Sequence, residues 1–405
     1  MHVVIHKDEP IVSSQIDSIE IELGQKTDGV LFLDKQFKVV EYPTKWLSHE
    51  ANNHRISDQS VVTYSRNMRY FLEYIDDHMS DEWSLDEKLL NVHLSLLENW
   101  VRYQLDELRL EASTVTNREM TIRAFYDYFT NGQFHTALIE NSPFPSNPLT
   151  TKPNSKQVQA VSVRDVQNLM FCTPYERERT LLQFLLDSGV RISELPRVTY
   201  GDVQEAQNFV SGSYITDGID KPAVEAGYAA LLIHGSKGRQ DSLKERHTVI
   251  TKPTLDRLKA YHSSPLYKRY QRLYADQNTA PIFFNTEGRP FTKASIAALI
   301  IRISKRAVKN GTLSKKAHAH LFRHSFAYLT LQDTGRGHDF LDRLVFVQKS
   351  LGHTSFKTTE EFYTKIPHDI YDSIVNKDGV IQTRIEKMQL LVDSTKTRIK
   401  LADKK

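Results

Sequence analysis

The sequence predicts a mainly α-helical protein that carries a small antiparallel β-sheet and folds as two lobes. Three observations support this fold class. Most of the 405 residues place apolar side chains at helical spacing, only a few short runs alternate as strands do, and a proline-rich stretch separates two helical blocks. The length suggests two or three domains of roughly 100 to 200 residues, each able to bury its own core.

The composition is typical of a globular protein. Hydrophobic residues make up 40% of the chain and charged residues 25%, and no run approaches the roughly 18 consecutive apolar residues of a membrane span. The N-terminus lacks the long apolar core and cleavage site of a signal peptide, so we expect a cytoplasmic protein without membrane association. The single cysteine, Cys172, has no second cysteine for a disulfide or a zinc cluster and is predicted to be a core thiol.

The distribution of charge says more than its total. The formal net charge of +3 is too small to indicate nucleic acid by itself. From Arg302 to Arg323 the chain has basic residues and no acid, whereas acids dominate between Glu73 and Glu111. A charge run is more often a solvated face than a binding site, so this pattern only favours a polyanionic partner for the C-terminal half.

The N-terminal part is expected to contain an appendage and a helical domain. Within residues 1–54, apolar residues alternate at 19–23 and 30–33, and the second stretch is followed after Asp34-Lys35 by the run 37–40. The alternation and the polar break predict two short strands that could form a hairpin. Residues 55–140 are predicted to form an all-helical domain. Its first helix begins near Ser57 or Asp58, and its second covers residues 89–108. Its third starts around Ser113 to Thr116, where Thr116 and Glu119 have capping-box spacing.

Residues 141–160 form the clearest linker in the sequence. Prolines and small polar residues defeat both helix and strand periodicity there. The segment is long enough to let two lobes close around something between them.

The C-terminal lobe, residues 161–375, is predicted to mix helices with two strands. A capped helix starts near Ser162, a buried helix ends at Gly189, and strands at 229–234 and 246–250 flank a polar turn. Further helices are expected at 252–274 and 292–309. In the tail, residues 376–405, a last helix from Val380 toward Leu401 has an apolar stripe, which could pack on its own domain or on a neighbouring protomer.

Polar residues of this lobe follow an order that resembles the tyrosine recombinases, also called the phage integrase family. The matching phrases are Ser188-Gly-Val-Arg191-Ile-Ser-Glu194-Leu, a lysine in the turn between the strands, His320-Leu-Phe-Arg323-His-Ser-Phe-Ala327, Leu351-Gly-His353-Thr-Ser, Thr358-Thr359 and Tyr363. The resemblance covers residues from about 160 to 370, and the helical block before it is similar to that family's core-binding domain in pattern alone.

The resemblance implies a fold, an activity and partners. The fold would be a helical core-binding domain plus an α+β catalytic domain, closed as a C-shaped clamp around DNA. The activity would be site-specific recombination of the integrase, transposase or resolvase type through a 3′-phosphotyrosine intermediate, without metal or cofactor. The expected partners are double-stranded DNA with specific recombination sites and a homotetramer on two duplexes formed by exchange of the C-terminal helix. DNA-bending accessory proteins are further candidates.

Cleavage of a phosphodiester without a metal requires the same residue types. Stabilising charge on the non-bridging oxygens of a phosphodiester calls for fixed donors, and two guanidiniums, Arg191 and Arg323, can each act bidentately. A phenol has a free pKa of about 10 and must lose its proton as it attacks. The departing 5′ hydroxyl needs a proton, which a lysine on a mobile turn can deliver.

The resemblance assigns roles to the remaining residues. It implies Tyr363 as the nucleophile, His320 as the group that helps to draw off its proton, and His353 as a further phosphate donor. Lys237 is the predicted general acid, because Gly235-Ser-Lys-Gly has the chemistry of a turn. Glu194 is expected to orient the site rather than react.

Several alternatives stay open on the sequence. Lys244 also fits the second half of the family's hairpin phrase, and Tyr363 stands ten residues after His353 where nine is usual. The histidines 318, 320 and 324 could be a zinc cluster, although their spacing and the missing fourth ligand argue against it. A type IB topoisomerase and a catalytically inactive DNA-binding relative are the alternative functions.

Overall fold

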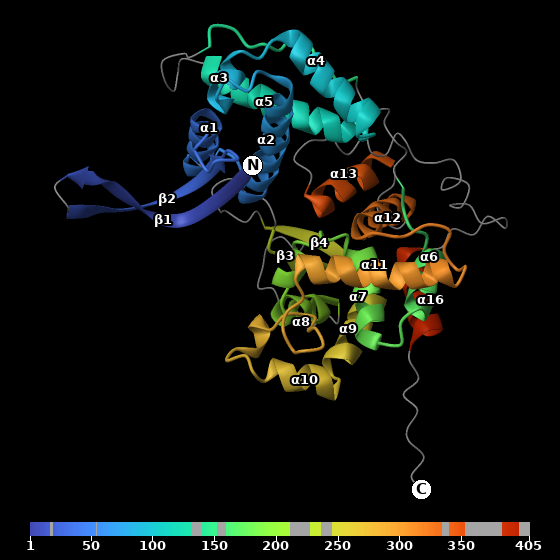
Figure 1. Cartoon of the computed structure of the whole chain (residues 1–405). Helices are drawn as coiled ribbons and strands as arrows, with labels where there is room; N and C mark the ends of the chain where they lie inside the picture. Colours follow the sequence, from blue (N-terminus) through green and yellow to red (C-terminus); the bar gives the residue numbers. More distant parts are fainter. Residues whose placement is uncertain are drawn as a thin grey trace. The chain divides into compact units, whose positions relative to one another are not determined.

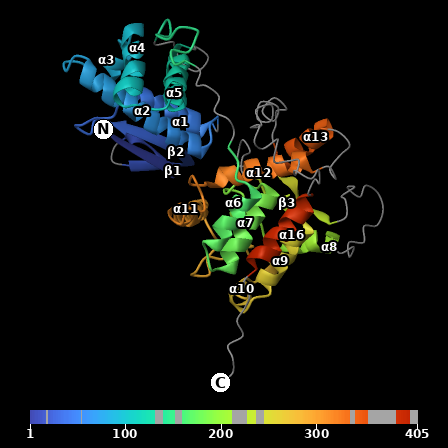
Figure 2. The same cartoon turned by 90° about the vertical axis from the view of Figure 1, so that its right-hand side faces the viewer.

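The computed structural model describes residues 1–16, 19–53, 55–130, 139–151, 159–210, 227–235, 245–333, 340–352 and 383–396, with the backbone alone at 6–28 and 340–342. The chain divides into two compact units, Met1–Ser155 and Lys156–Lys405, whose elements are drawn in Figures 1 and 2. Each unit has its own hydrophobic core. Helices dominate, and the described residues contain two two-stranded antiparallel sheets. The predicted fold class, mainly helical with little antiparallel sheet, is confirmed.

The first unit joins a β-hairpin to a group of helices. Its core is aromatic, with Trp46, Phe71, Trp100 and Phe125 at most 1% exposed. The elements are β1 (His2–Ile16), β2 (Ile19–Leu33), α1 (Glu41–Asn52), α2 (Asp58–His78), α3 (Leu85–Leu90), α4 (Leu94–Arg102), a π-helical turn η1 (Tyr103–Glu107) and α5 (Ala112–Thr130).

The hairpin differs from the predicted one. Residues 19–23 and 30–33 both belong to β2, and their partner is β1, which begins at His2. The base of the hairpin is part of the core, since Val30 and Phe32 are fully buried and their amides donate to the hydroxyls of Ser48 and Thr44 on α1, each at 3.0 Å. The predicted appendage is therefore anchored to the first unit at its base.

One predicted helix and one predicted cap in this unit were wrong. The helix expected at 89–108 is divided into α3, α4 and η1, and a capping box formed by Ser84 and Glu87 starts α3 as a separate, earlier turn. α5 begins at Ala112, close to the predicted start, but Thr116 lies inside it and does not cap it; the Thr116 hydroxyl donates to the carbonyl of Ala112, four residues earlier, at 2.9 Å. The predicted cap at Ser57 is present at the start of α2.

The first half of the predicted linker belongs to the first unit. Glu119, fully buried on α5, accepts hydrogen bonds from the backbone amides of Leu149 and Thr150 at 2.7 and 2.8 Å and from the Thr150 hydroxyl at 2.6 Å. Phe144 is 8% exposed and packs in the same core. Capping-box spacing thus pointed to Glu119, but its carboxylate serves a contact distant in sequence.

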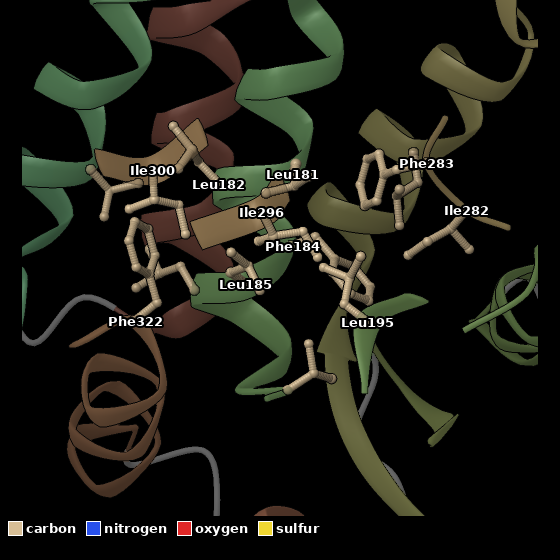
Figure 3. Close-up of a cluster of buried hydrophobic side chains, with 14 of the residues drawn as sticks. Leu181, Leu182, Phe184, Leu185, Leu195, Ile282, Phe283, Ile296, Ile300 and Phe322 are labelled. Atoms are coloured by element: carbon tan, nitrogen blue, oxygen red, sulfur yellow. The ribbon is translucent and has the colours of Figure 1, made fainter. Parts of the chain in front are cut away.

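The second unit surrounds a larger core. Figure 3 shows Leu181, Leu182, Phe184 and Leu185 of α7 in this core together with Ile296, Ile300 and Phe322. Cys172, 7% exposed, belongs to it as predicted. The elements are α6 (Val163–Phe171), α7 (Glu176–Ser188), the 3-10 turn η2 (Leu195–Arg197), α8 (Tyr200–Val210), β3 (Tyr228–Ile233), β4 (Arg246–Thr251), α9 (Lys252–His262), α10 (Pro265–Gln271), the 3-10 turn η3 (Gln277–Thr279), α11 (Lys293–Lys309), α12 (Ala319–Gln332), α13 (Phe340–Leu351) and α16 (Arg384–Thr395).

Local signals in this unit were mostly read correctly. Ser162 caps α6 in a capping box with Asp165, and α7 ends at Gly189. Strands β3 and β4 pair antiparallel from Tyr228 opposite Thr251 to Ile233 opposite Arg246. The helix predicted at 252–274 is interrupted, because Ser264 caps a new helix, α10, that begins with a proline.

The C-terminal helix α16 packs on its own unit, against α6, α7 and α9. Its buried residues are Arg384, Met388, Leu391 and Thr395. Arg384 is fully buried, and its guanidinium donates to the carboxylate of Asp187 at 2.8 Å and to the carbonyl of the same residue at 2.7 Å. An ion pair inside the core therefore fixes the start of α16.

Replacing Arg384 with methionine tests this anchor. Arg384→Met leaves the buried Asp187 carboxylate without its cation, which typically costs about 3 to 5 kcal/mol. Circular dichroism during urea unfolding measures the loss, because all three tryptophans lie in the first unit and their fluorescence does not report on α16. Lys396→Met, an exposed change at the end of the same helix, is the control. Equal stability of the two variants would contradict the anchor.

Candidate active site

The end of α7 positions Arg191. Gly189 adopts a left-handed conformation with φ +61°, and a Cβ there would lie 2.5 Å from the ring of Phe326 on α12. Only glycine meets both demands without strain. The chain can therefore turn sharply against α12, and Arg191 follows two residues later.

Glu194 orients Arg191 and is fully buried. Its carboxylate accepts from the backbone amide of Arg191 and from its Nη1, each at 2.8 Å, and from Nη2 of Arg246 at 2.8 Å. Burial raises the pKa of the Glu194 carboxyl, but the charges of Arg246 and Arg191 and the hydrogen bonds from both outweigh burial and lower that pKa. Glu194 is therefore ionised at neutral pH and fixes the position of Arg191 through these hydrogen bonds.

Arg191 keeps donors for a ligand. Its side chain is 36% exposed, and only its Nη1 and backbone amide are used by Glu194. Within the described part of the chain its Nε and Nη2 make no hydrogen bond to protein. These donors are free to hold the oxygens of an anion.

Arg323 on α12 joins the same place from the other side. Its guanidinium is 4% exposed and donates from Nη1 to the carbonyl of Gly189 at 2.8 Å and from Nη2 to the carbonyl of Leu351 at 2.5 Å. These two bonds fix the plane of the guanidinium and use two of its five donors. One carbonyl thus connects Arg323 to the turn that carries Arg191.

His320 lies one turn before Arg323 on α12, with part of its ring exposed. Partial burial of the imidazole, together with the positive charges of Arg323, His318 and Arg191, lowers the His320 pKa. The neutral ring can accept a proton near pH 7. His324 packs edge-on against it, with ring centroids 4.3 Å apart.

The turn with both lysine candidates, Lys237 and Lys244, lies outside the described residues, but the ends of its two strands are held firmly. Arg197 donates to the carbonyls of His234 and Gly235 at 3.0 and 2.6 Å. The His234 ring lies 3.0 Å from Glu245 and 3.1 Å from Asp202, measured to carboxylate oxygens. The contacts of His234 with Asp202 and Glu245 are called the His234 clamp below. The sequence pattern did not predict them.

His353 and Tyr363 also lie outside the described residues. The structure reaches Gly352, which has φ +64° directly after α13. Of the predicted site residues, the described part of the chain therefore brings together Arg191, Glu194, His320 and Arg323.

The basic run divides into anchors and exposed charge. Arg302 and Arg306 on α11 bind the Glu178 carboxylate at 2.6 Å and the Cys172 carbonyl at 2.7 Å. Other members of the run, Lys305, Lys309, Lys315 and Lys316, are exposed. The run thus combines structural contacts with a positively charged surface.

The described residues show neither a metal cluster nor a membrane-spanning helix. Among them no three His, Cys, Asp or Glu side chains are placed to hold a metal ion. No helix in the described ranges has the length and apolar character needed to cross a bilayer.

The fold brings two arginines that are far apart in sequence, Arg191 and Arg323, to one place, an arrangement suited to an anionic ligand. The family model for the phage integrase family matches residues 160–368. The tyrosine recombinase XerC of Lacticaseibacillus casei strain BL23 is 25% identical over 317 residues, which cover 76% of this chain and 89% of the relative. The XerC of Listeria innocua serovar 6a is 22% identical, with 80% and 92% covered.

Solved structures show the same fold. The XerH site-specific recombinase bound to palindromic difH substrate aligns with a TM-score of 0.54 at 20% identity, covering 80% of each chain. The Tn1549 transposon integrase in complex with transposon right-end DNA aligns with a TM-score of 0.55 at 18% identity, covering 82% of this chain and 96% of that one. The chain belongs to the phage integrase family. It is accordingly a tyrosine-type site-specific DNA recombinase.

The pKa of His320 can be measured by NMR titration of its ring protons, with His320→Gln identifying the resonance. We expect a value below the usual 6.5 or so, because burial and nearby cations disfavour the imidazolium. Arg191→Gln removes one of these cations and is expected to raise the pKa. Arg289→Gln, at a side chain 79% exposed, is the control. A fall in the Arg191→Gln protein would contradict the electrostatic account.

The His234 clamp predicts pH-dependent stability. Burial lowers the His234 pKa, but Glu245 and Asp202 outweigh it and raise that pKa. The stabilisation is therefore complete below the unfolded value of about 6.5 and is lost as pH rises through the higher folded value. The melting-temperature difference between wild type and His234→Gln should shrink with rising pH. The control is His247→Gln on exposed His247, and a widening difference for His234→Gln would reverse the assigned sign.

Proposed function

We propose that this recombinase cuts DNA by attack of the Tyr363 oxygen on a phosphodiester, which forms a 3′-phosphotyrosine bond as the bond to the 5′ oxygen breaks. The supporting observation is that Arg323 donates to the Gly189 carbonyl, two residues before Arg191, so two guanidiniums that are far apart in sequence converge. Fixed donors of this kind stabilise charge on non-bridging oxygens. Rejoining reverses the same step and needs no external energy.

We propose the following roles for the other residues. His320, kept neutral by its surroundings, helps to take the proton of Tyr363. Lys237 protonates the departing 5′ oxygen, with Lys244 as the alternative. His353 donates to the phosphate, while Glu194 orients Arg191 and does not react. No step in this scheme calls for a metal or a cofactor.

We further propose the domain roles and the assembly. Residues 55–140 are the core-binding domain, 161–375 the catalytic domain, and the two close as a C-shaped clamp around a duplex with specific sites. The enzyme acts in the cytoplasm, where a bacterial chromosome lies, as a homotetramer on two duplexes, and DNA-bending proteins are candidate helpers.

Exchange of the C-terminal helix completes this proposal. In the single chain, α16 packs on its own unit through Arg384 and Asp187. An exchanged helix can remake the same contacts on a neighbouring copy, as in domain swapping, at little cost in contacts.

A nicked duplex that carries a cognate recombination site, sought among repeats in the DNA beside the coding gene, tests the nucleophile, because loss of the short leaving strand traps the covalent complex. Wild type should form a protein-DNA adduct and Tyr363→Phe none, since phenylalanine lacks the attacking oxygen. Tyr371→Phe is the matched control and should react as wild type does. An adduct with Tyr363→Phe would refute the assignment, and site-independent relaxation by a monomer would favour a topoisomerase. The affinity for DNA should also fall steeply as the salt concentration rises, because contacts with phosphates release counterions.

A further inference from the structure

Arg246 is a buried cation that none of the proposed roles uses. It is the first residue of β4, directly after the strand connection that carries both lysine candidates. Its side chain is 9% exposed, and its Nη2 donates to the Glu194 carboxylate at 2.8 Å. A side chain so buried and so engaged is not placed to bind DNA backbone. Its guanidinium serves the protein itself.

The other terminal nitrogen of Arg246, Nη1, binds the end of α13. It donates to the carbonyl of Ser350, and Arg323 donates to the next carbonyl, that of Leu351. The last carbonyls of a helix lack intrahelical partners and carry partial negative charge. Two guanidiniums therefore donate to successive carbonyls at the end of α13, directly before Gly352 and His353 in the sequence.

Gly352 fits closely against the same side chain. Its φ is +64°, and a Cβ there would lie 2.6 Å from Cδ of Arg246. Any other residue would strain the backbone and displace the arginine. The end of α13 is thus fixed jointly by Gly352 and Arg246.

We infer that Arg246 is a positioning residue for recombination: through Glu194 it fixes Arg191, and through the Ser350 carbonyl it fixes the approach of His353. One guanidinium thereby sets the relative placement of two groups that hold the non-bridging oxygens. The inference rests on the proposed function, because it concerns how these groups meet the phosphate.

The rate of covalent adduct formation on the nicked duplex tests the inference. Arg246→Gln should lower the single-turnover rate about 10²-fold, the usual effect of a misplacement near 1 Å, while DNA affinity stays unchanged. Arg246→Lys can reach one partner but not both, so its single-turnover rate should lie between those of wild type and Arg246→Gln. Arg289→Gln, an exposed arginine, is the matched control and should react at the wild-type rate.

A second substrate, with sulfur in place of the bridging 5′ oxygen, separates this role from an effect on the lysine turn. A thiolate leaves without a proton, so it bypasses the general acid. The Arg246 variants should stay slow on this substrate, because their defect lies at the non-bridging oxygens. A return of the Arg246 variants to the wild-type rate on the sulfur substrate would overturn the inference. So would wild-type rates of both variants on the oxygen substrate, or loss of the folded state in both, measured by circular dichroism. If wild type itself forms no adduct, the proposed function fails instead.

Discussion

The site depends on three successive residues at the end of α7. The Asp187 carboxylate binds Arg384 of α16 and also accepts from the amide and hydroxyl of Thr251 on β4 at 2.9 and 2.7 Å. The Ser188 carbonyl accepts from β4, and the Gly189 carbonyl accepts from Arg323. The C-terminal helix, the sheet and α12 therefore all meet at one helix end. Because each bond is buried, leaving any of these groups unpaired would be costly, so the convergence of the arginines follows from the fold itself.

Charge in the site is unbalanced. Glu194 is a single buried carboxylate shared by Arg191 and Arg246, while Arg323 is held by neutral carbonyls. Three guanidiniums thus face one carboxylate among these residues, and the surplus is positive. An anion brought between Arg191 and Arg323 would offset this positive surplus.

Much of the fold and part of the site could be predicted from the sequence, and the limits have a physical cause. The end of α7 at Gly189, the two strands of the second unit and the caps at Ser57 and Ser162 are local signals that were read correctly. The Ser84 capping box and the Ser264 cap are local signals that were missed. Another error arose where a distant contact decides the outcome, because Glu119 has capping-box spacing but its carboxylate binds residues 149 and 150. Arg246 was passed over for the same reason, although it stands inside a phrase already noted for Lys244.

The contacts of Glu119 also shorten the tether between the two units. The chain is fastened at Thr150 on one side, and on the other the Val161 amide donates to Ser325 at 2.8 Å. Eleven peptide steps between these points span at most about 40 Å when fully extended. Two modules joined by so short a connection have an effective concentration for each other of the order of millimolar. Binding of one module therefore keeps the other near the same ligand, so that a second contact needs only modest affinity.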